Sequence, residues 1–295
     1  MPRPLTWLAR GRVLTLERPI VMGVLNVTPD SFSDGGCFTA PEAALRRAGV
    51  MIAEGADIID IGGQSTRPQG AVPVTVAEEL QRVIPVVRAI VAEYPDSIVS
   101  VDTVNSMVAG ESIAAGAHIV NDVSAMRLDP SMGAVVAATG AGIVLMHSRG
   151  DVTSMATYEH AEYDGCVTEV VEAELAVCIR AARASGIDAG CIALDPGLGF
   201  AKRPDDSLRM LARLDRLVAL GHPVVVGASR KRMIGGITGV TDPSARVHGS
   251  VGAALAAWAR GAAVLRVHDV AATRQALDVM AAVERASFDT TMAEA

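Results

Sequence analysis

Short apolar runs recur along the whole chain, separated by longer stretches in which apolar and polar residues mix. The runs are rich in Val and Ile and almost continuous in apolar character, which is typical of parallel strands buried on both faces. Eight runs fit this description: Ile20–Leu25, Ile58–Ile61, Ile98–Val101, His118–Val120, Gly142–Met146, Ile192–Leu194, Pro223–Val226 and Ala263–Val267. We therefore expect eight parallel strands.

The stretches that follow these runs carry Ala, Leu, Glu and Arg at the three- and four-residue spacing of an amphipathic helix. They are Pro41–Glu54, Val76–Glu93, Asn105–Ala115, Ser131–Ala138, Glu162–Ser185, Asp205–Leu220, Pro243–Arg260 and Val270–Arg285. Glycine, which favours the left-handed conformation that ends many helices, follows six of them. Eight strands alternating strictly with eight helices predict an α/β fold, a (β/α)8 barrel.

An open doubly wound sheet is the alternative fold for the same alternation. The count of eight strands, and the absence of a GxGxxG motif after the first, favour the barrel. A short strand or hairpin is expected before it, around Val13–Leu16. Since no linker divides the chain, we expect one barrel domain over residues 1–288 and a short frayed tail over residues 289–295.

Composition narrows the possible partners and the compartment. The net charge is −7 and no run of Lys and Arg is longer than three residues, so we expect neither nucleic acid nor an anionic membrane surface as a partner. The four cysteines form no CxxC pair, which indicates free thiols in a reducing cytoplasm. Pro and Arg near the amino terminus do not fit a signal peptide, so we expect none, and the apolar runs are too short for an expected membrane-spanning helix.

Almost every apolar run ends in a polar or ionisable residue. These residues are Asn26, Asp60, Asp102, Asn121 with Asp122, His147, Asp195, Ser229–Lys231, and Arg266 with His268. One such residue is most often a helix cap or a turn former. In a barrel, however, the carboxyl ends of all strands meet at one rim, where active sites lie. We therefore expect a catalytic or ligand-binding rim.

Two kinds of chemistry can be separated on this rim. Ser229, Arg230, Lys231, Arg266 and His268 follow the last two strands, where barrels often bind phosphate. The alternative is that the two arginines pair with acidic helix residues. Carboxylates and an amide also follow the central strands and suit the donor edge of a 2-aminopyrimidinone: Asp102, Asn121 and Asp195.

Several of these residues have competing interpretations. Asp102 could cap the helix that begins near Asn105, and Asp122 is interpreted as structural. His147 is interpreted as a core histidine, whereas Met146 suits the wall of a flat-ring pocket. No HxH or HExxH pattern supports zinc.

Two long loops, residues 26–38 and 62–74, are rich in Gly, Pro, Ser and Thr and are expected to be mobile covers. Arg67 in the second loop could reach a phosphate. Asn26 offers one oxygen ligand, so the plausible metal is Mg2+ held mainly by substrate phosphates and water.

These segments together resemble the dihydropteroate synthase family over essentially the whole chain. The segments that carry the resemblance are GVLNVTPDSFSDGG from Gly23, DIGGQSTRP from Asp60, SVDT from Ser100, IVND from Ile119, LMH from Leu145, LDPGLGF from Leu194, GASRKRMIG from Gly227 and RVHD from Arg266. The resemblance implies a transferase of folate biosynthesis, which joins 6-hydroxymethyl-7,8-dihydropterin pyrophosphate to p-aminobenzoate, releases pyrophosphate, uses Mg2+ and is the target of sulfonamides.

The resemblance also implies a role for each matching residue. The implied pterin-binding residues are Asp102, Asn121, Met146, Asp195, Lys231 and Arg266. The implied pyrophosphate-binding residues are Asn26, Arg67, Arg266 and His268, and Asn26 is also the implied ligand of Mg2+. The p-aminobenzoate pocket would comprise Phe32, Ser65, Thr66, Pro68, Phe200, Ser229 and Lys231. Catalysis would depend on Asp102, Asp195, Lys231, Arg266 and His268.

The chain departs from the family pattern in the second loop. Gln64 replaces the usual Glu, and the loop is one residue longer after Pro68. Three alternatives therefore stay open: a pterin-binding methyltransferase domain, an aldolase-type barrel with Lys231 as Schiff-base nucleophile, and a non-catalytic pterin-binding homologue. The family implies a homodimer formed through barrel helices, for which the Ala-rich stretch Val251–Ala259 is a candidate.

Overall fold

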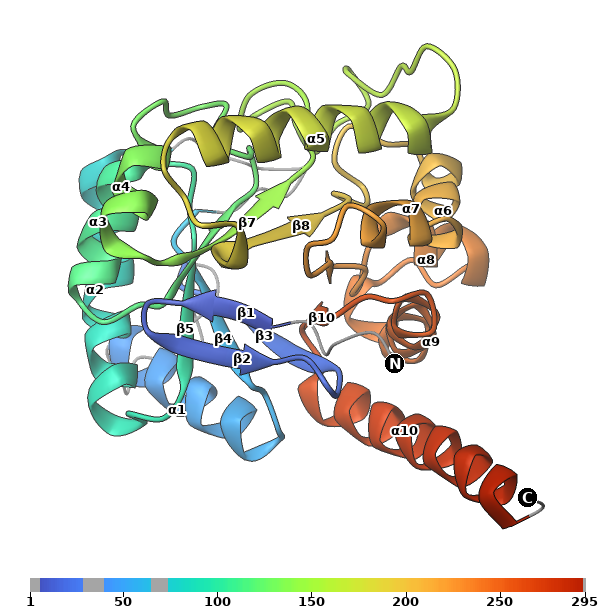
Figure 1. Cartoon of the computed structure of the whole chain (residues 1–295). Coiled ribbons are helices and arrows are strands. Elements are labelled where there is room, and N and C mark those ends of the chain that lie inside the picture. The colour runs from blue at the N-terminus through green and yellow to red at the C-terminus, as the bar shows by residue number, and fades with distance from the viewer. Residues whose placement is uncertain (1–5, 29–39, 65–73, 294–295) are drawn as a thin grey trace.

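The computed structural model describes residues 6–28, 40–64 and 74–293 of the chain. Eight parallel strands form one sheet in the order β8-β7-β6-β5-β4-β3-β10-β9 (Figure 1). A parallel bridge between Leu194 and Val224 joins β8 to β9 and closes the sheet. The strands are β3 (Ile20–Asn26), β4 (Ile58–Gly62), β5 (Ile98–Asp102), β6 (Ile119–Asp122), β7 (Gly142–Met146), β8 (Ile192–Asp195), β9 (Val225–Val226) and β10 (Val264–Val267). The predicted barrel is confirmed.

The helices surround this sheet on the outside (Figure 1). They are α1 (Ala40–Ala53), α2 (Val76–Glu93), α3 (Ser106–Ala114), α4 (Met132–Thr139), α5 (Val167–Ala184), α6 (Pro204–Ala212), α7 (Asp215–Val218), α8 (Arg232–Thr238), α9 (Val247–Trp258) and α10 (Val270–Ala293), with the short 3-10 turns η2 (Ala189–Cys191) and η3 (Pro243–Ala245). No described helix has both the length and the apolarity needed to cross a bilayer.

Four helices differ from the sequence prediction. The predicted helix 205–220 is divided into α6 and α7, because the helical backbone is interrupted at Arg213. Leu214 and Leu217, which follow the interruption, are buried. The stretch from Glu162 becomes helical only at Val167, and Pro243 begins a 3-10 turn before α9. The last helix continues to Ala293, so residues 289–293 are helical and not a separate frayed tail.

The expected amino-terminal hairpin is present and covers one end of the barrel (Figure 1). Its strands, β1 (Thr6–Ala9) and β2 (Arg12–Thr15), pair in antiparallel register. Trp7 is fully buried, and its indole Nε1 donates a hydrogen bond of 2.9 Å to the carbonyl of Cys191. It packs in a cluster with inward-facing residues near the start of the strands, among them Met22, Ile58 and Val264.

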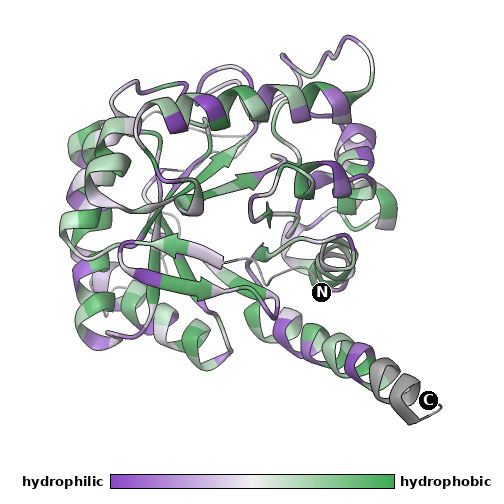
Figure 2. Ribbon diagram, in the orientation of Figure 1, coloured by the Kyte–Doolittle hydropathy of each residue, from purple (hydrophilic) through white to green (hydrophobic). Residues whose placement is uncertain are grey.

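Side chains alternate between the inside and the outside of the barrel, as a strand requires. Outward residues pack against the helices; on β4, for example, these are Ile59 and Ile61. The strands are therefore largely apolar, while the outer helices mix both kinds of residue (Figure 2). Inward residues change character along each strand: Ile58 is followed two positions later by Asp60, and Val264 by Arg266.

Candidate active site

Arg266 bridges two carboxylates, Asp60 and Asp102, in the layer of inward-facing polar residues near the carboxyl ends of the strands. From β10 its Nε donates to Asp60 Oδ2 at 2.6 Å, and its Nη2 donates to Asp102 Oδ2 at 2.7 Å. Burial opposes the charge of Arg266, but Asp60 and Asp102 outweigh it and raise its pKa. Its partners are therefore strand-end carboxylates, and the alternative of pairing with helix residues is wrong for Arg266.

Asp60 was recognised from the sequence only as the end of a strand, yet it holds this layer together. Its side chain is completely buried, and Oδ2 also accepts a hydrogen bond of 3.1 Å from Asn121 Nδ2. Its Oδ1 has no hydrogen-bond partner among the described residues. The signal that could have identified it is its position, two residues after Ile58 on the same inward face.

Asp102 and Asp195 supply two further carboxylates to the rim. Burial raises the pKa of Asp102; Arg266 opposes this shift and the Asp60 carboxylate adds to it. Burial also raises the pKa of Asp195, which accepts a hydrogen bond of 2.7 Å at Oδ1 from the Gly197 N–H. Asp102 does not cap α3, because the N-cap of that helix is Asn105. The capping alternative is therefore wrong.

Lys231 stands at the start of α8 and faces the same rim. Its Nζ donates to the carbonyl of Leu198 and lies 4.8 Å from the centre of the Phe200 ring. Burial lowers the pKa of Lys231 to about 8, although the carboxylate of Asp195 favours its charged form. A cation, a carboxylate and an aromatic face are thus brought together.

An apolar wall borders these charges. Met146, at the end of β7, is 4% exposed and packs with Val123 and Met155, and Phe200 lies against the same cluster. Asn121 is equally buried and comes from the adjacent strand β6. The predicted combination of a thioether wall with amide and carboxylate groups is therefore present in space.

The residues after β9 and β10 divide into two groups. Ser229 Oγ accepts a hydrogen bond of 3.2 Å from the His268 N–H and lies 3.0 Å from His268 Nδ1. Arg230 instead donates from Nε to Asp269 Oδ2 at 3.0 Å. For Arg230, therefore, the alternative of pairing with an acidic residue holds.

Asn26 and Asp102 both lie against Gly62. A Cβ at Gly62 would be 3.6 Å from Asn26 Oδ1 and 3.9 Å from Asp102 Oδ2. Five predicted site residues, by contrast, lie outside the described residues: Phe32, Ser65, Thr66, Arg67 and Pro68. Their predicted roles stay predictions.

His147 is a core histidine, as expected. It is 4% exposed, its Nε2 lies 2.8 Å from Glu174 Oε2, and its Nδ1 lies 2.7 Å from Lys202 Nζ. Burial lowers the pKa of His147 to about 4, and the ammonium of Lys202 adds to this shift. Lys202 is 1% exposed and was not singled out from the sequence. Within the part of the chain that the structure describes, no group of three His, Cys, Asp or Glu side chains could hold a metal.

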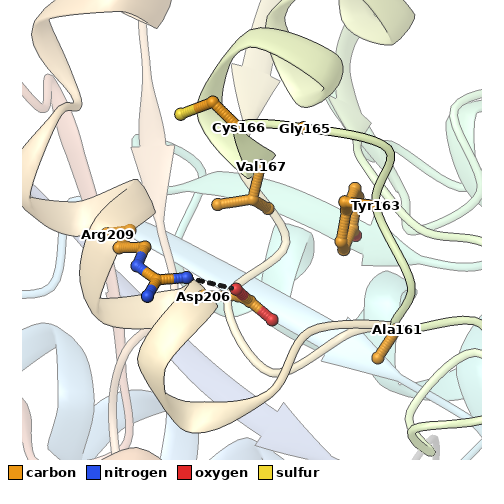
Figure 3. A pocket seen from close by; sticks show the side chains of 7 residues that line it. All are labelled: Ala161, Tyr163, Gly165, Cys166, Val167, Asp206 and Arg209. Atoms are coloured by element: carbon orange, nitrogen blue, oxygen red, sulfur yellow. Dashed lines mark hydrogen bonds and ion pairs between the residues drawn. The ribbon is translucent and has the colours of Figure 1, made fainter.

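A separate cavity of about 400 Å³ lies between the segment before α5 and α6. Tyr163, Cys166 and Asp206 line it, and Asp206 pairs with Arg209 there (Figure 3). None of the strand-end residues lines this cavity. It adjoins the site indirectly, because the Tyr163 hydroxyl donates to the carbonyl of Ala201 at 2.8 Å, just after Phe200.

Comparison with known proteins gives consistent matches. The family model described as pterin binding enzyme matches residues 22–268. Dihydropteroate synthase of Escherichia coli (strain K12) is 44% identical over 274 residues, covering 93% of this chain and 95% of that protein. A mitochondrial folate synthesis bifunctional protein of Arabidopsis thaliana is 44% identical over 276 residues, covering 90% of this chain. The chain spans only about half (50%) of the length of that protein.

Solved structures agree with these relatives. Dihydropteroate synthase of Xanthomonas albilineans with 4-aminobenzoic acid superposes with a TM-score of 0.89 at 48% identity, covering 95% of this chain and 98% of that chain. The Yersinia pestis enzyme with a sulfonamide drug complex gives a TM-score of 0.87 at 42% identity, covering 95% and 100%. These matches favour the synthase over the methyltransferase and aldolase alternatives. The chain therefore belongs to the pterin binding enzyme family, among its dihydropteroate synthases.

Proposed function

We propose that this chain condenses 6-hydroxymethyl-7,8-dihydropterin pyrophosphate with p-aminobenzoate to give 7,8-dihydropteroate and pyrophosphate. The observation that carries the proposal is the inward polar layer, in which Arg266 bridges Asp60 and Asp102 beside Asn121. Structures of Xanthomonas albilineans dihydropteroate synthase with 4-aminobenzoic acid and with 7,8-dihydropteroate support the choice of substrates.

The pterin would bind between the carboxylates and the apolar wall. Asp102 and Asp195 are acceptors for the ring N–H and the exocyclic amine, and Asn121 can both donate and accept. The Arg266 guanidinium and the Met146 thioether would lie against the ring faces. Since the carboxylates are held by Arg266 and by the Gly197 N–H, they are positioned before the substrate arrives.

The chemical step needs charge stabilisation more than proton removal. The carbon–oxygen bond of the pterin methylene breaks, and its electron pair leaves with pyrophosphate. The amine nitrogen then attacks the methylene carbon and afterwards releases its proton. An arylamine is neutral at pH 7, so it needs no strong base. The cations Lys231 and Arg266, together with hydrogen bonds from His268, would favour the departing anion, whereas Asp102 and Asp195 favour the positive charge on the pterin.

The amine substrate would lie on the Lys231 side of the site. The Phe200 ring lies beside the Lys231 ammonium and Ser229 precedes the lysine by two positions, whereas the remaining predicted contacts are in the two loops. These contacts are Phe32, Ser65, Thr66 and Pro68, with Arg67 directed to the pyrophosphate. Gln64, which replaces the usual Glu, precedes them directly.

Mg2+ fits the oxygen atoms that lie beside Gly62. Asn26 Oδ1 and Asp102 Oδ2 are both close to this glycine, and hard divalent cations prefer such amide and carboxylate oxygens. Asn26 would hold the ion together with the pyrophosphate of the substrate. When bound, Mg2+ would neutralise charge on the leaving pyrophosphate.

We also infer a homodimer formed through α9, whose residues Val251, Ala253 and Leu255 are partly exposed. Light scattering on the purified chain tests this inference, and a monomer at micromolar concentration would contradict it. A cytoplasmic location is consistent with Cys166, Cys178 and Cys191, which are free thiols.

The decisive test of the function is pyrophosphate release that requires the pterin pyrophosphate, p-aminobenzoate and Mg2+ together. Lys231→Ala and Asp102→Asn should each lower kcat/KM by about 100-fold or more, because each removes a charge placed at the reacting atoms. Asp215→Asn, which changes an exposed carboxylate on an outer helix, is the matched control. Absence of turnover in the wild type would contradict the proposal, and full activity in both site variants would contradict the residue assignment.

A further inference from the structure

Lys202 is a buried lysine that the proposed mechanism does not use. Burial lowers the pKa of Lys202 to about 7, whereas the Asp195 carboxylate favours its charged form. The chain has 26 Lys and Arg residues, and only two of them are lysines, Lys202 and Lys231. Lys202 lies in the loop between β8 and α6 and is 1% exposed. Lysine is rarely buried completely, because its charge loses hydration there unless it finds partners. A lysine buried at this position therefore needs partners for its polar end.

The ammonium of Lys202 has three acceptors within hydrogen-bond distance. They are His147 Nδ1 at 2.7 Å, the carbonyl of Phe200 at 3.2 Å and the carbonyl of Gly197 at 3.3 Å. An ammonium carries three donors and no acceptor, so the charged form satisfies all three groups. The planar, larger guanidinium of an arginine could not direct its donors to the same three points.

The tautomer of His147 is consistent with this arrangement. Arg149 holds Glu174 through its guanidinium, and both Arg149 and His147 lower the pKa of Glu174 to about 2. The ionised Glu174 can only accept, so His147 Nε2 carries the proton and donates it to Glu174. The Nδ1 lone pair of His147 is then free to accept from Lys202. Hydrogen bonds are therefore donated in one direction, from Lys202 to His147 and from His147 to Glu174.

The loop that Lys202 holds sets the position of three site residues. The Gly197 N–H donates to Asp195, the Leu198 carbonyl accepts from Lys231, and the Phe200 ring lies 4.8 Å from the Lys231 ammonium. The loop is also seated tightly. Gly197 has a φ of +64°, and a Cβ there would lie 1.9 Å from the carbonyl oxygen of His147. A small movement of the loop would therefore displace Asp195, Lys231 and Phe200 together.

We propose that Lys202 is a positioning residue for the condensation, because its ammonium fixes the Gly197–Phe200 loop to His147. His147 in turn directly follows Met146, the wall of the pterin pocket, so Lys202 connects both substrate subsites. This inference rests on the proposed function for its kinetic consequences. Its structural part, the dependence of the Lys231 environment on Lys202, can be tested without any substrate.

The kinetic test compares Lys202→Met with Tyr163→Phe. The first variant keeps the length of the side chain but leaves the two loop carbonyls without their donor. The second removes the hydrogen bond from Tyr163 to Ala201 in the same segment and serves as a control for loop stability. We expect Lys202→Met to raise KM for p-aminobenzoate about tenfold and to lower kcat/KM about 100-fold, as expected for a misplacement near 1 Å. Tyr163→Phe should change both parameters less than threefold.

A purely structural role would give a different result. Loss of folded protein lowers the apparent kcat through the active fraction and leaves KM unchanged. Unchanged KM values in Lys202→Met would therefore overturn the proposal, and so would a rescue of wild-type kinetics by Lys202→Arg. If the wild type shows no turnover at all, the proposed function fails, and the structural test that follows still decides the role of Lys202.

The structural test uses the small number of lysines. Nuclear magnetic resonance of protein labelled only in lysine side chains should give two signals, and Lys231→Ala assigns them. In His147→Phe, which keeps the Lys202 side chain but removes its acceptor, the Lys231 titration should move upward from about 8, because a loosened loop admits water. Tyr163→Phe should leave it in place. A Lys231 titration that is the same in all three proteins would contradict the proposal even if Lys202→Met fails to fold.

Discussion

The two ends of the barrel interior are made from the same strands, but one end is lined by apolar residues and the other by charged residues. At one end, Trp7 of the hairpin closes a layer of inward-facing residues such as Ile58 and Val264. Two positions further along the same strands, the inward residues are Asp60 and Arg266. The strand period of two thus lets one short segment contribute to the apolar core and to the active site. Substitutions in the first layer should therefore change stability, and substitutions in the second should also change catalysis.

The largest effect is expected for Arg266→Met. This change leaves Asp60 and Asp102 without their shared cation in a buried layer, so the free energy of unfolding should fall by about 3–5 kcal/mol. We expect kcat/KM to fall on the order of 1000-fold, since a group at the reacting centre is lost. Denaturant unfolding and steady-state kinetics measure the two effects. Arg213→Met, which breaks an exposed pair with Asp215, is the control; equal losses in both variants would contradict the assignment.

The second largest effect is expected for Trp7→Ala, which changes the apolar layer at the hairpin end of the barrel. Trp7→Ala removes a fully buried side chain and its hydrogen bond to the Cys191 carbonyl. The free energy of unfolding should fall by about 3–5 kcal/mol. KM for either substrate should stay within twofold of the wild type when measured on folded protein, because the rim is at the other end of the strands. A tenfold change in KM would show that the two layers are coupled.

Most of this architecture could be predicted from the sequence because it depends on local periodicity. Continuous apolar runs identified the eight strands, and the residues at their ends located the rim. Arg266 and Asp60 share a simple rule, since each lies two positions after an inward apolar residue. Asp60 was nevertheless assigned no role beyond its place on the rim, because one carboxylate at a strand end is usually a cap or a turn former.

The remaining errors come from residues whose environment no local pattern determines. Arg230 lies in a turn with a φ of +61°, and its guanidinium pairs with Asp269, which follows a different strand. Lys202 precedes Arg203 at the start of a helix and looks like an exposed charge. Its burial depends on His147, which is 55 positions away in the chain. Long-range contacts of this kind cannot be read from spacing alone.

A smaller effect should appear in the pH dependence of the rim. The pKa of Lys231 is lowered to about 8, so its positive charge is present below this pH and is lost above it. We expect kcat/KM to fall about tenfold per pH unit above pH 8. The unfolded chain keeps the ordinary lysine pKa of 10.5 and binds more protons between pH 8 and 10.5, so this group raises stability with pH in that window. Activity and stability should thus move in opposite directions. In Lys231→Arg, whose charge persists, the decline above pH 8 should disappear.

The smallest effect is expected for Arg230→Met, which compares two neighbouring cations, one paired with Asp269 and the other, Lys231, facing the rim. Arg230 lies between Ser229 and Lys231 in the sequence, yet it pairs with Asp269 and does not contribute a cation to the polar layer. Because the pair is partly exposed, we expect a loss of about 1 kcal/mol in stability. We also expect a change of less than threefold in kcat/KM. Lys231→Met, one residue away, should cost far more activity. If both variants lose activity equally, Arg230 also contributes to the predicted phosphate site. The assignment of Lys231 to the polar layer and of Arg230 to a pair outside it would then be wrong.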